Sequence, residues 1–221
     1  MNSIPTRASA TNDPQPPTPS TTGLVVLAAG QASRMGTPKQ LLEWDGKPLI
    51  RHAVEQALQS KCTPVVVVLG FGASQMREAL AGLPIQIVEN PAWETGMASS
   101  IQTGVQALAA LNINSLILTL ADQPKLTPAI YDHLAQLHRE TGQSVVTSEY
   151  SGTVGVPVLF GRERYADLLA LKGAQGCKGV IQAHRDQALG VPCPEAEFDI
   201  DTPADYERLR GGPDIAAAPL K

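Results

Sequence analysis

The chain has 221 residues, of which 43% are hydrophobic, and carries a formal net charge of −4. This length suits one α/β domain with a well-buried core rather than two full domains, and the acidic balance argues against nucleic-acid binding. Three widely spaced cysteines and apolar runs too short to cross a bilayer favour a reducing, cytoplasmic location away from membranes.

The two ends of the chain differ in composition from its middle. Residues 1–22 contain five prolines and no hydrophobic segment, so we expect a disordered extension rather than a secretory signal. Residues 211–221 have the composition of a second loose tail. We therefore expect the folded domain between residues 23 and 210.

Strand and helix patterns alternate along this middle part. Apolar and β-branched runs predict strands at residues 24–27, 64–69, 84–88, 115–120 and 144–147. Apolar residues at helical spacing predict a helix that begins at Pro48, and two more along the stripes Met97–Leu108 and Ile130–Leu137. The alternation predicts an α/β fold with a Rossmann-like, mainly parallel sheet flanked by helices. Its ligands are expected beyond the carboxyl ends of the strands.

The loop after the first predicted strand, within LAAGQASRMGTPKQLL, has the chemistry of an anion-binding site. Gly30 allows backbone N–H groups to approach a ligand closely, and Ser33 adds a hydroxyl donor. Arg34 and Lys39 supply positive charge. The spacing is not that of a Walker A loop, which ends in G-K-[ST]. Taken alone, these residues fit either a triphosphate site or a solvated basic loop.

A second glycine pair, Gly70 and Gly72, follows the predicted strand 64–69 and looks like the start of a dinucleotide-binding fingerprint. Gln75 stands where that fingerprint has its third glycine, which is needed for close packing of helix on strand. Nicotinamide binding is therefore the weaker alternative.

Acidic residues at two places are candidates for holding a divalent cation. Asp122 directly follows the most apolar predicted strand, and Pro124 keeps the chain extended there. Mg²⁺ takes one or two carboxylates together with phosphate oxygens. If residues 197–201 are extended, Asp199 and Asp201 point to the same face. In the simpler interpretation, Asp201 or Thr202 only caps the last helix.

The four histidines show no spacing typical of a catalytic or metal-binding pair, and the sequence contains no G-x-S-x-G motif. We expect them to be structural or surface groups.

Taken together, these motifs resemble a known family. LAAGQASRMGTPKQLL is similar to the signature loop of the molybdenum-cofactor nucleotidyltransferases, commonly written L-A-[AG]-G-x-[SA]-x-R-[MF]-G-x-x-K. NPAWETGMASSIQTGVQAL, ADQPKLT, GVPVLF and FDIDTPADY resemble later blocks of that family, in the same order. The opening loop is shared with sugar-phosphate and alditol-phosphate nucleotidyltransferases, whereas the full set resembles the cytidylyl branch, which joins CTP to molybdopterin or its molybdenum-loaded form.

The resemblance implies a glycosyltransferase-A type fold and a nucleotide site. Leu27, Ala28 and Ala29 match the backbone segment that lines the nucleotide. Arg34 and Lys39 match the positions that bind the triphosphate. Catalysis would rest on positioning and on charge neutralisation, because the acceptor phosphate is already ionised and needs no protein base.

The resemblance also implies one Mg²⁺ site and further contacts. Asp122 matches the magnesium aspartate, and Asp199 matches the second metal carboxylate of D-x-G-T-P in related sugar nucleotidyltransferases. Asn90 and Ser99 lie in a block that contacts nucleotide or substrate. The implied partners are a nucleoside triphosphate, a phosphorylated acceptor such as molybdopterin, and the recipient molybdoenzyme or its chaperone.

One stretch departs from the family pattern. Where the family often carries G-D-x-G-x-R, this chain reads GAQGCKG, with Ala174 for the aspartate and Lys178 for the arginine. Lysine does not reproduce the bidentate grip of arginine on phosphate. GTP in place of CTP, a sugar or alditol phosphate as acceptor, and a non-catalytic cofactor-binding or chaperone protein therefore remain alternatives.

Overall fold

The computed structural model describes residues 21–31, 38–111 and 113–211. The expected N-terminal extension, apart from its last two residues, and the tail after Gly211 lie outside the described residues. Ser33 and Arg34 lie outside them as well.

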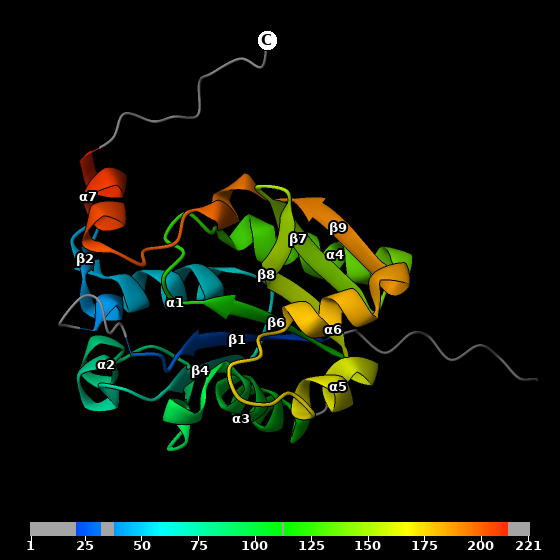
Figure 1. Ribbon diagram of the computed structural model, residues 1–221. Coiled ribbons are helices and arrows are strands. Elements are labelled where there is room, and N and C mark those ends of the chain that lie inside the picture. The colour runs from blue at the N-terminus through cyan, green and yellow to red at the C-terminus, as the bar shows by residue number, and fades with distance from the viewer. Residues whose placement is uncertain (1–20, 32–37, 112, 212–221) are drawn as a thin grey trace, which may run out of the picture.

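A seven-stranded sheet with the order β5-β4-β1-β6-β8-β7-β9 forms the centre of the molecule (Figure 1). Four neighbouring strands are parallel: β1 (Thr22–Ala28), β4 (Val65–Leu69), β5 (Gln86–Glu89) and β6 (Ser115–Leu120). The other three are β7 (Val145–Tyr150), β8 (Thr153–Gly161) and β9 (Ala188–Pro192). β8 is antiparallel to both β6 and β7, whereas β9 is parallel to β7.

Across residues 21–31, 38–111 and 113–211, seven helices and a small two-stranded ribbon accompany the sheet. The helices are α1 (Leu49–Gln59), α2 (Ala73–Ala79), α3 (Met97–Ala109), α4 (Pro128–Thr141), α5 (Tyr165–Leu169), α6 (Lys178–Ala183) and α7 (Pro203–Gly211). β2 (Glu43–Trp44) and β3 (Lys47–Pro48) form the ribbon. The short 3-10 turns are η1 (Lys39–Leu41), η2 (Trp93–Thr95), η3 (Arg162–Arg164), η4 (Arg185–Gln187) and η5 (Pro194–Glu197).

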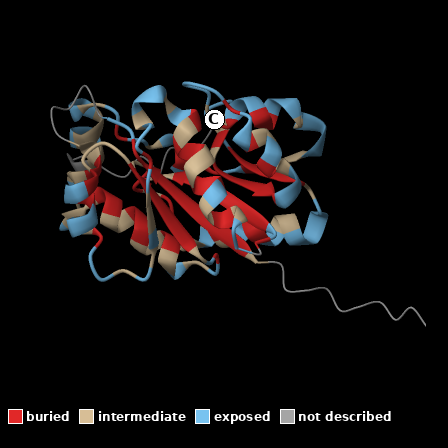
Figure 2. Ribbon diagram, turned by 90° about the horizontal axis from the view of Figure 1, so that it is seen from below, coloured by how far each residue is buried: buried red, intermediate tan, exposed pale blue. Residues whose placement is uncertain are grey.

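The sheet is buried on both faces, which explains why its parallel strands are continuous apolar runs. Leu24, Val26 and Ala28 of β1 join the core that includes side chains of α1, α2 and α4. Val25 and Leu27 point to the opposite face and pack with α3, α5 and α6. Figure 2 shows the buried strands between helices whose outer sides are exposed. The expected three-layer α/β fold with a mainly parallel sheet is confirmed.

Three details of the sequence interpretation are wrong. Pro48 lies in β3 and precedes α1, with ψ at 138°, so the helix begins at Leu49. Met97 opens α3 but is 40% exposed, so the buried stripe of that helix begins further along the chain. Residues 197–201 do not form a strand, because η5 extends to Glu197 and irregular chain follows.

No helix in the described part of the chain is both long and apolar enough to cross a membrane.

Candidate active site

A cleft of about 610 Å³ lies at the carboxyl end of β1 and β6. These neighbouring strands are parallel, with Leu27 opposite Leu120, so the segments that follow them emerge side by side. The amide of Ala121 donates to the carbonyl of Leu27 over 3.2 Å and continues the pairing by one residue. The fold thus brings the opening loop next to Asp122.

Most of the described site candidates meet in this cleft. Lining it are Leu27, Ala28, Ala29, Gly30, Lys39, Asp122, Asp199 and Asp201. Asn90 and Ser99 are not among its lining residues.

Asn90 and Ser99 lie one layer behind the cleft wall. Asn90 is 2% exposed, and its amide nitrogen donates to the hydroxyls of Ser99 and Ser100 over 2.8 and 3.0 Å. Its side-chain oxygen accepts from the amide of Ala92. Ser100, the next residue along α3, lines the cleft. Asn90 therefore braces the segment between β5 and α3, and through it the cleft wall.

Asp199 and Asp201 reach the cleft because the residue between them is anchored. Ile200 is fully buried, and its amide donates to the main-chain carbonyl of Asp122 over 3.1 Å. This contact fastens the segment before α7 to the end of β6 and leaves an aspartate on either side of the anchor. A buried docking residue, rather than strand periodicity, brings the carboxylates together.

Thr202 is the residue that caps α7. Its hydroxyl donates to Asp205 Oδ2 and accepts from the amide of Asp205, a reciprocal arrangement typical of helix N-termini. This capping role falls on Thr202 and leaves Asp201 free for other contacts.

Lys39 connects the two acidic segments. Its Nζ lies 2.6 Å from Asp122 Oδ2 and 2.6 Å from Asp201 Oδ1. The side chains of Lys39 and Asp122 are each 14% exposed, whereas that of Asp201 is 58% exposed. Burial alone lowers the pKa of Lys39, but the charge and hydrogen bonds of the two aspartates outweigh it and raise that pKa above its ordinary value. The ammonium is thus firmly charged.

Negative charge nevertheless dominates the described lining of the cleft. Burial raises the pKa of Asp199, and the charges of Asp201 and Asp122 raise it further. Asp122 Oδ1 is buried and has no hydrogen-bond partner among the described residues. The described residues contain no group of three or more His, Cys, Asp or Glu side chains that could hold a metal by themselves. A cation here would need oxygen ligands from elsewhere.

Sequence patterns miss several lining residues. Gln40 is 4% exposed, and its amide donates to the carbonyl of Gly30 over 3.1 Å. Its buried oxygen has no partner in the part of the chain that the structure describes. Trp93 lines the cleft and packs edge-on against Phe71, with ring centroids 5.5 Å apart. A single glutamine or tryptophan outside a periodic pattern gives no signal of its own.

The glycine pair after β4 has a structural explanation. A Cβ on Gly70 would lie 2.8 Å from the carbonyl oxygen of Ala29 and 2.7 Å from Trp93 Cβ. Gly72 adopts a left-handed conformation, with φ at 68°, just before α2. Gly70 is therefore required for close packing under the opening loop, and nicotinamide binding is not needed to explain it.

The histidines lie away from the cleft, as expected. His52 Nε2 is 3.0 Å from the carbonyl of Pro124, and His184 Nε2 is 2.9 Å from Asp167 Oδ2. None of the four lines the cleft.

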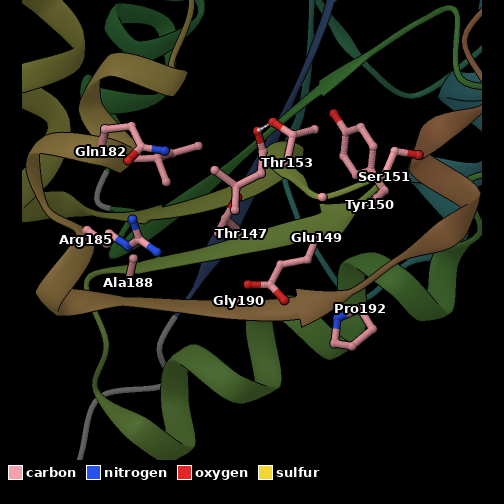
Figure 3. Close-up of a pocket in the computed structure, with 13 residues that line it drawn as sticks. Thr147, Glu149, Tyr150, Ser151, Thr153, Gln182, Arg185, Ala188, Gly190 and Pro192 are labelled. Carbon is pink, nitrogen blue, oxygen red and sulfur yellow. Dashed lines mark hydrogen bonds between the residues drawn. The ribbon is translucent and has the colours of Figure 1, made fainter.

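A second groove, of about 670 Å³, lies between β7, β9 and α6 (Figure 3). Glu149 on β7, Gln182 on α6 and Arg185 line it. Tyr150, at the carboxyl end of β7, also lines it; burial raises the pKa of this tyrosine and the charge of Asp199 raises it further. One residue that lines the groove, Tyr150, therefore lies within electrostatic range of Asp199.

Comparisons with known proteins identify a family. The model of a family described as the MobA-like NTP transferase domain matches residues 24–188. Molybdenum cofactor cytidylyltransferase of Escherichia coli is 25% identical over 82% of this chain and 92% of its own length.

Several solved structures are similar to this chain over most of their length. Rv0371c from Mycobacterium tuberculosis is 28% identical over 87% of this chain and 98% of its own, with a TM-score of 0.76. The same protein is known as a complex with manganese, with a TM-score of 0.69. A nucleotidyl transferase from Methanothermobacter is 25% identical over 86% of this chain and 96% of its own, with a TM-score of 0.74.

Proposed function

This chain belongs to the MobA-like NTP transferase family, and we propose that it joins the cytidylyl group of CTP to the phosphate of molybdopterin or molybdenum cofactor. The chain is a nucleotidyltransferase, so its substrates are a nucleoside triphosphate and a phosphorylated acceptor. The observation that carries the proposal is the meeting of Ala28–Gly30, Lys39 and Asp122 in one cleft at the carboxyl edge of the sheet.

We assign the triphosphate to the opening loop. Backbone N–H groups around Gly30 and the Lys39 ammonium supply donors and positive charge at the end of β1. Arg34, outside the described residues, keeps its proposed contact with the triphosphate. Leu27 and Ala29 would line the nucleotide, and Asn90 with Ser99 would hold the facing wall in place.

The residues present fit a divalent cation, which we take to be Mg²⁺. A buried carboxylate oxygen without a partner on Asp122 and the charge accumulated at Asp199 are what such an ion would relieve. Asp122 and Asp199 would hold it, and when bound it would neutralise charge on the triphosphate.

The proposed transfer needs no protein group to remove a proton. An oxygen of the acceptor phosphate forms a bond to the α-phosphorus of CTP, the bond from that phosphorus to the β-bridging oxygen breaks, and pyrophosphate leaves. The attacking oxygen is already ionised at neutral pH. Lys39 and the loop orient the chain of phosphates and offset its charge, which agrees with the absence of histidine from the cleft lining.

We assign the body of the acceptor to the groove between β7, β9 and α6. This groove lies at the end of the sheet beyond β6 and β8, away from β1 and β4. Glu149 offers a carboxylate that can accept from the amino and ring N–H groups of a pterin. Arg185 offers a cation for an anionic substituent.

Pyrophosphate release tests the proposal. The protein is incubated with Mg²⁺, each of the four nucleoside triphosphates, and molybdopterin or a sugar 1-phosphate. Release with CTP and molybdopterin supports it. Release only with GTP would identify a guanylyltransferase, and release only with the sugar phosphate would identify a sugar-phosphate nucleotidyltransferase. The shared opening loop fits both alternatives. Binding of molybdopterin without any release would identify a non-catalytic carrier.

A further inference from the structure

Lys39 places its ammonium on the carboxylate that we assign to the cation. Its ammonium contacts Asp122 and Asp201 at 2.6 Å each, and only 14% of the lysine side chain is exposed. Asp199 lines the same cleft and completes the acidic group. In the structure, the Lys39 ammonium therefore serves as the cation of a site rich in carboxylates.

We propose that Lys39 holds the place of the metal ion in the free protein, so that the ion enters with the triphosphate rather than before it. An ammonium and a divalent cation repel each other, so the Lys39 ammonium on Asp122 Oδ2 opposes the binding of an ion at the other oxygen of the same carboxylate. The phosphate chain offers Lys39 a new anionic partner. When the lysine turns to it, Asp122 becomes available to the ion that the triphosphate brings.

Two features of the site favour entry of the ion together with the triphosphate. The described residues hold no group of three or more metal-ligating side chains, so a bare ion would find few protein ligands, and the charge of Lys39 weighs against even those. A triphosphate supplies the missing oxygens, as is usual for Mg²⁺. This inference rests on the proposed function, since it takes the cleft to be the triphosphate site. It gives Lys39 a second task, that of linking metal entry to nucleotide entry.

The experiment is a titration of the whole protein with Mn²⁺ alone, without nucleotide, in which free Mn²⁺ is followed by its paramagnetic resonance signal. Lys39→Met removes the charge and keeps the length of the side chain. Lys125→Met is the matched control, because Lys125 follows the same strand β6 but packs over the ring of Phe198. We expect Lys39→Met to bind Mn²⁺ at least about tenfold more tightly than the wild type, and Lys125→Met to bind as the wild type does.

A double variant locates the effect. In Lys39→Met combined with Asp122→Asn, the gain in Mn²⁺ affinity should disappear. Lys39→Gln, which keeps a hydrogen-bond donor for Asp122, replaces the methionine variant if circular dichroism shows that the latter is unfolded. Equal Mn²⁺ affinity in the wild type and the neutral Lys39 variant, or a gain that survives Asp122→Asn, would overturn the inference. Neither result depends on turnover, so a failure here is distinct from a failure to release pyrophosphate.

Discussion

Lys39 Nζ and Asp122 Oδ2 lie 2.6 Å apart and join the turn that follows the opening loop to the loop that follows β6. The contact is largely shielded from water, and Asp201 shares the same ammonium. From the sequence alone Lys39 is a phosphate ligand only. In the structure it also offsets the charge of a group of carboxylates, so its removal affects both ligand binding and folding.

Substitution of Lys39 by alanine should therefore have two effects. Loss of a charge-assisted contact to phosphate should weaken apparent CTP affinity by roughly 1.5–3 kcal/mol. Loss of its partner leaves Asp122 unpaired beside Asp199, so the melting temperature without ligand should fall as well. Steady-state kinetics and thermal melting measure the two effects, with Lys125→Ala as the control. Wild-type CTP affinity in Lys39→Ala would contradict the assignment of the triphosphate to the part of the cleft beside Lys39.

Exchange of the cleft aspartates for asparagine should separate their roles. Asp122→Asn and Asp199→Asn should each lower the metal-dependent rate by about 10²-fold or more, the scale of one lost preorganised electrostatic contact. Asp201→Asn should be milder, because that side chain is 58% exposed and contacts Lys39. Rates at saturating CTP and metal give the comparison. An equal loss for all three would mean that Asp201 is a direct ligand.

Asp199→Asn should stabilise the protein in the absence of ligands. The pKa of Asp199 in the folded state lies above its ordinary value of 3.8, because of burial and the neighbouring charges of Asp201 and Asp122. The folded protein thus binds this proton more tightly than the unfolded chain, so ionisation of Asp199 costs stability as pH rises through the folded-state pKa. The variant should exceed the wild type in unfolding free energy at pH 7, and the gap should narrow as pH falls toward 3.8. Denaturant titrations at several pH values measure this difference in unfolding free energy. A difference that grows as the pH falls would contradict the upward direction of the pKa shift.

The sequence predicts the half of the site that depends on local rules. A strand followed by a glycine-containing basic loop, and a carboxylate directly after an apolar strand, suffice to place Gly30, Lys39 and Asp122 at one edge of a parallel sheet. The pairing of Lys39 with Asp201 could not be predicted this way. It depends on the docking of Ile200 under Asp122, a long-range contact with no periodic signature.

The sequence patterns also fail to predict β8 and β9, for a related reason. β8 contains Gly155 and Pro157, and β9 contains Gly190 and Pro192, residue types that weaken a strand pattern. Their place in the sheet comes from pairing with β7 rather than from intrinsic preference.

Gly70→Ala should displace the backbone at Ala29, where the opening loop begins. The new methyl group would meet the carbonyl oxygen of Ala29 at 2.8 Å, and a backbone atom cannot move away cheaply. We expect a lower melting temperature together with weaker CTP binding. Gly176→Ala is the control, because its Cβ would have open space around it. Should Gly70→Ala bind CTP normally, the packing under Ala29 would have no bearing on the nucleotide site.

Glu149→Gln should affect the acceptor and not the nucleotide. Glu149 lines the groove assigned to the acceptor and packs against Gly190 (Figure 3). We expect a higher KM for molybdopterin and an unchanged KM for CTP. Glu140→Gln, on the exposed face of α4, is the matched control. A change confined to the KM for CTP would contradict this placement of the acceptor.

Transfer of label from [α-³²P]CTP tests the central claim most directly, because it follows the atom that the reaction moves. The whole protein is incubated with the labelled nucleotide, Mg²⁺ and molybdopterin, and the products are separated by charge. The account predicts ³²P in a molybdopterin–cytidine dinucleotide, in step with pyrophosphate, and its loss in Asp122→Asn. Label that stays in CTP, or appears only as free CMP, would contradict it.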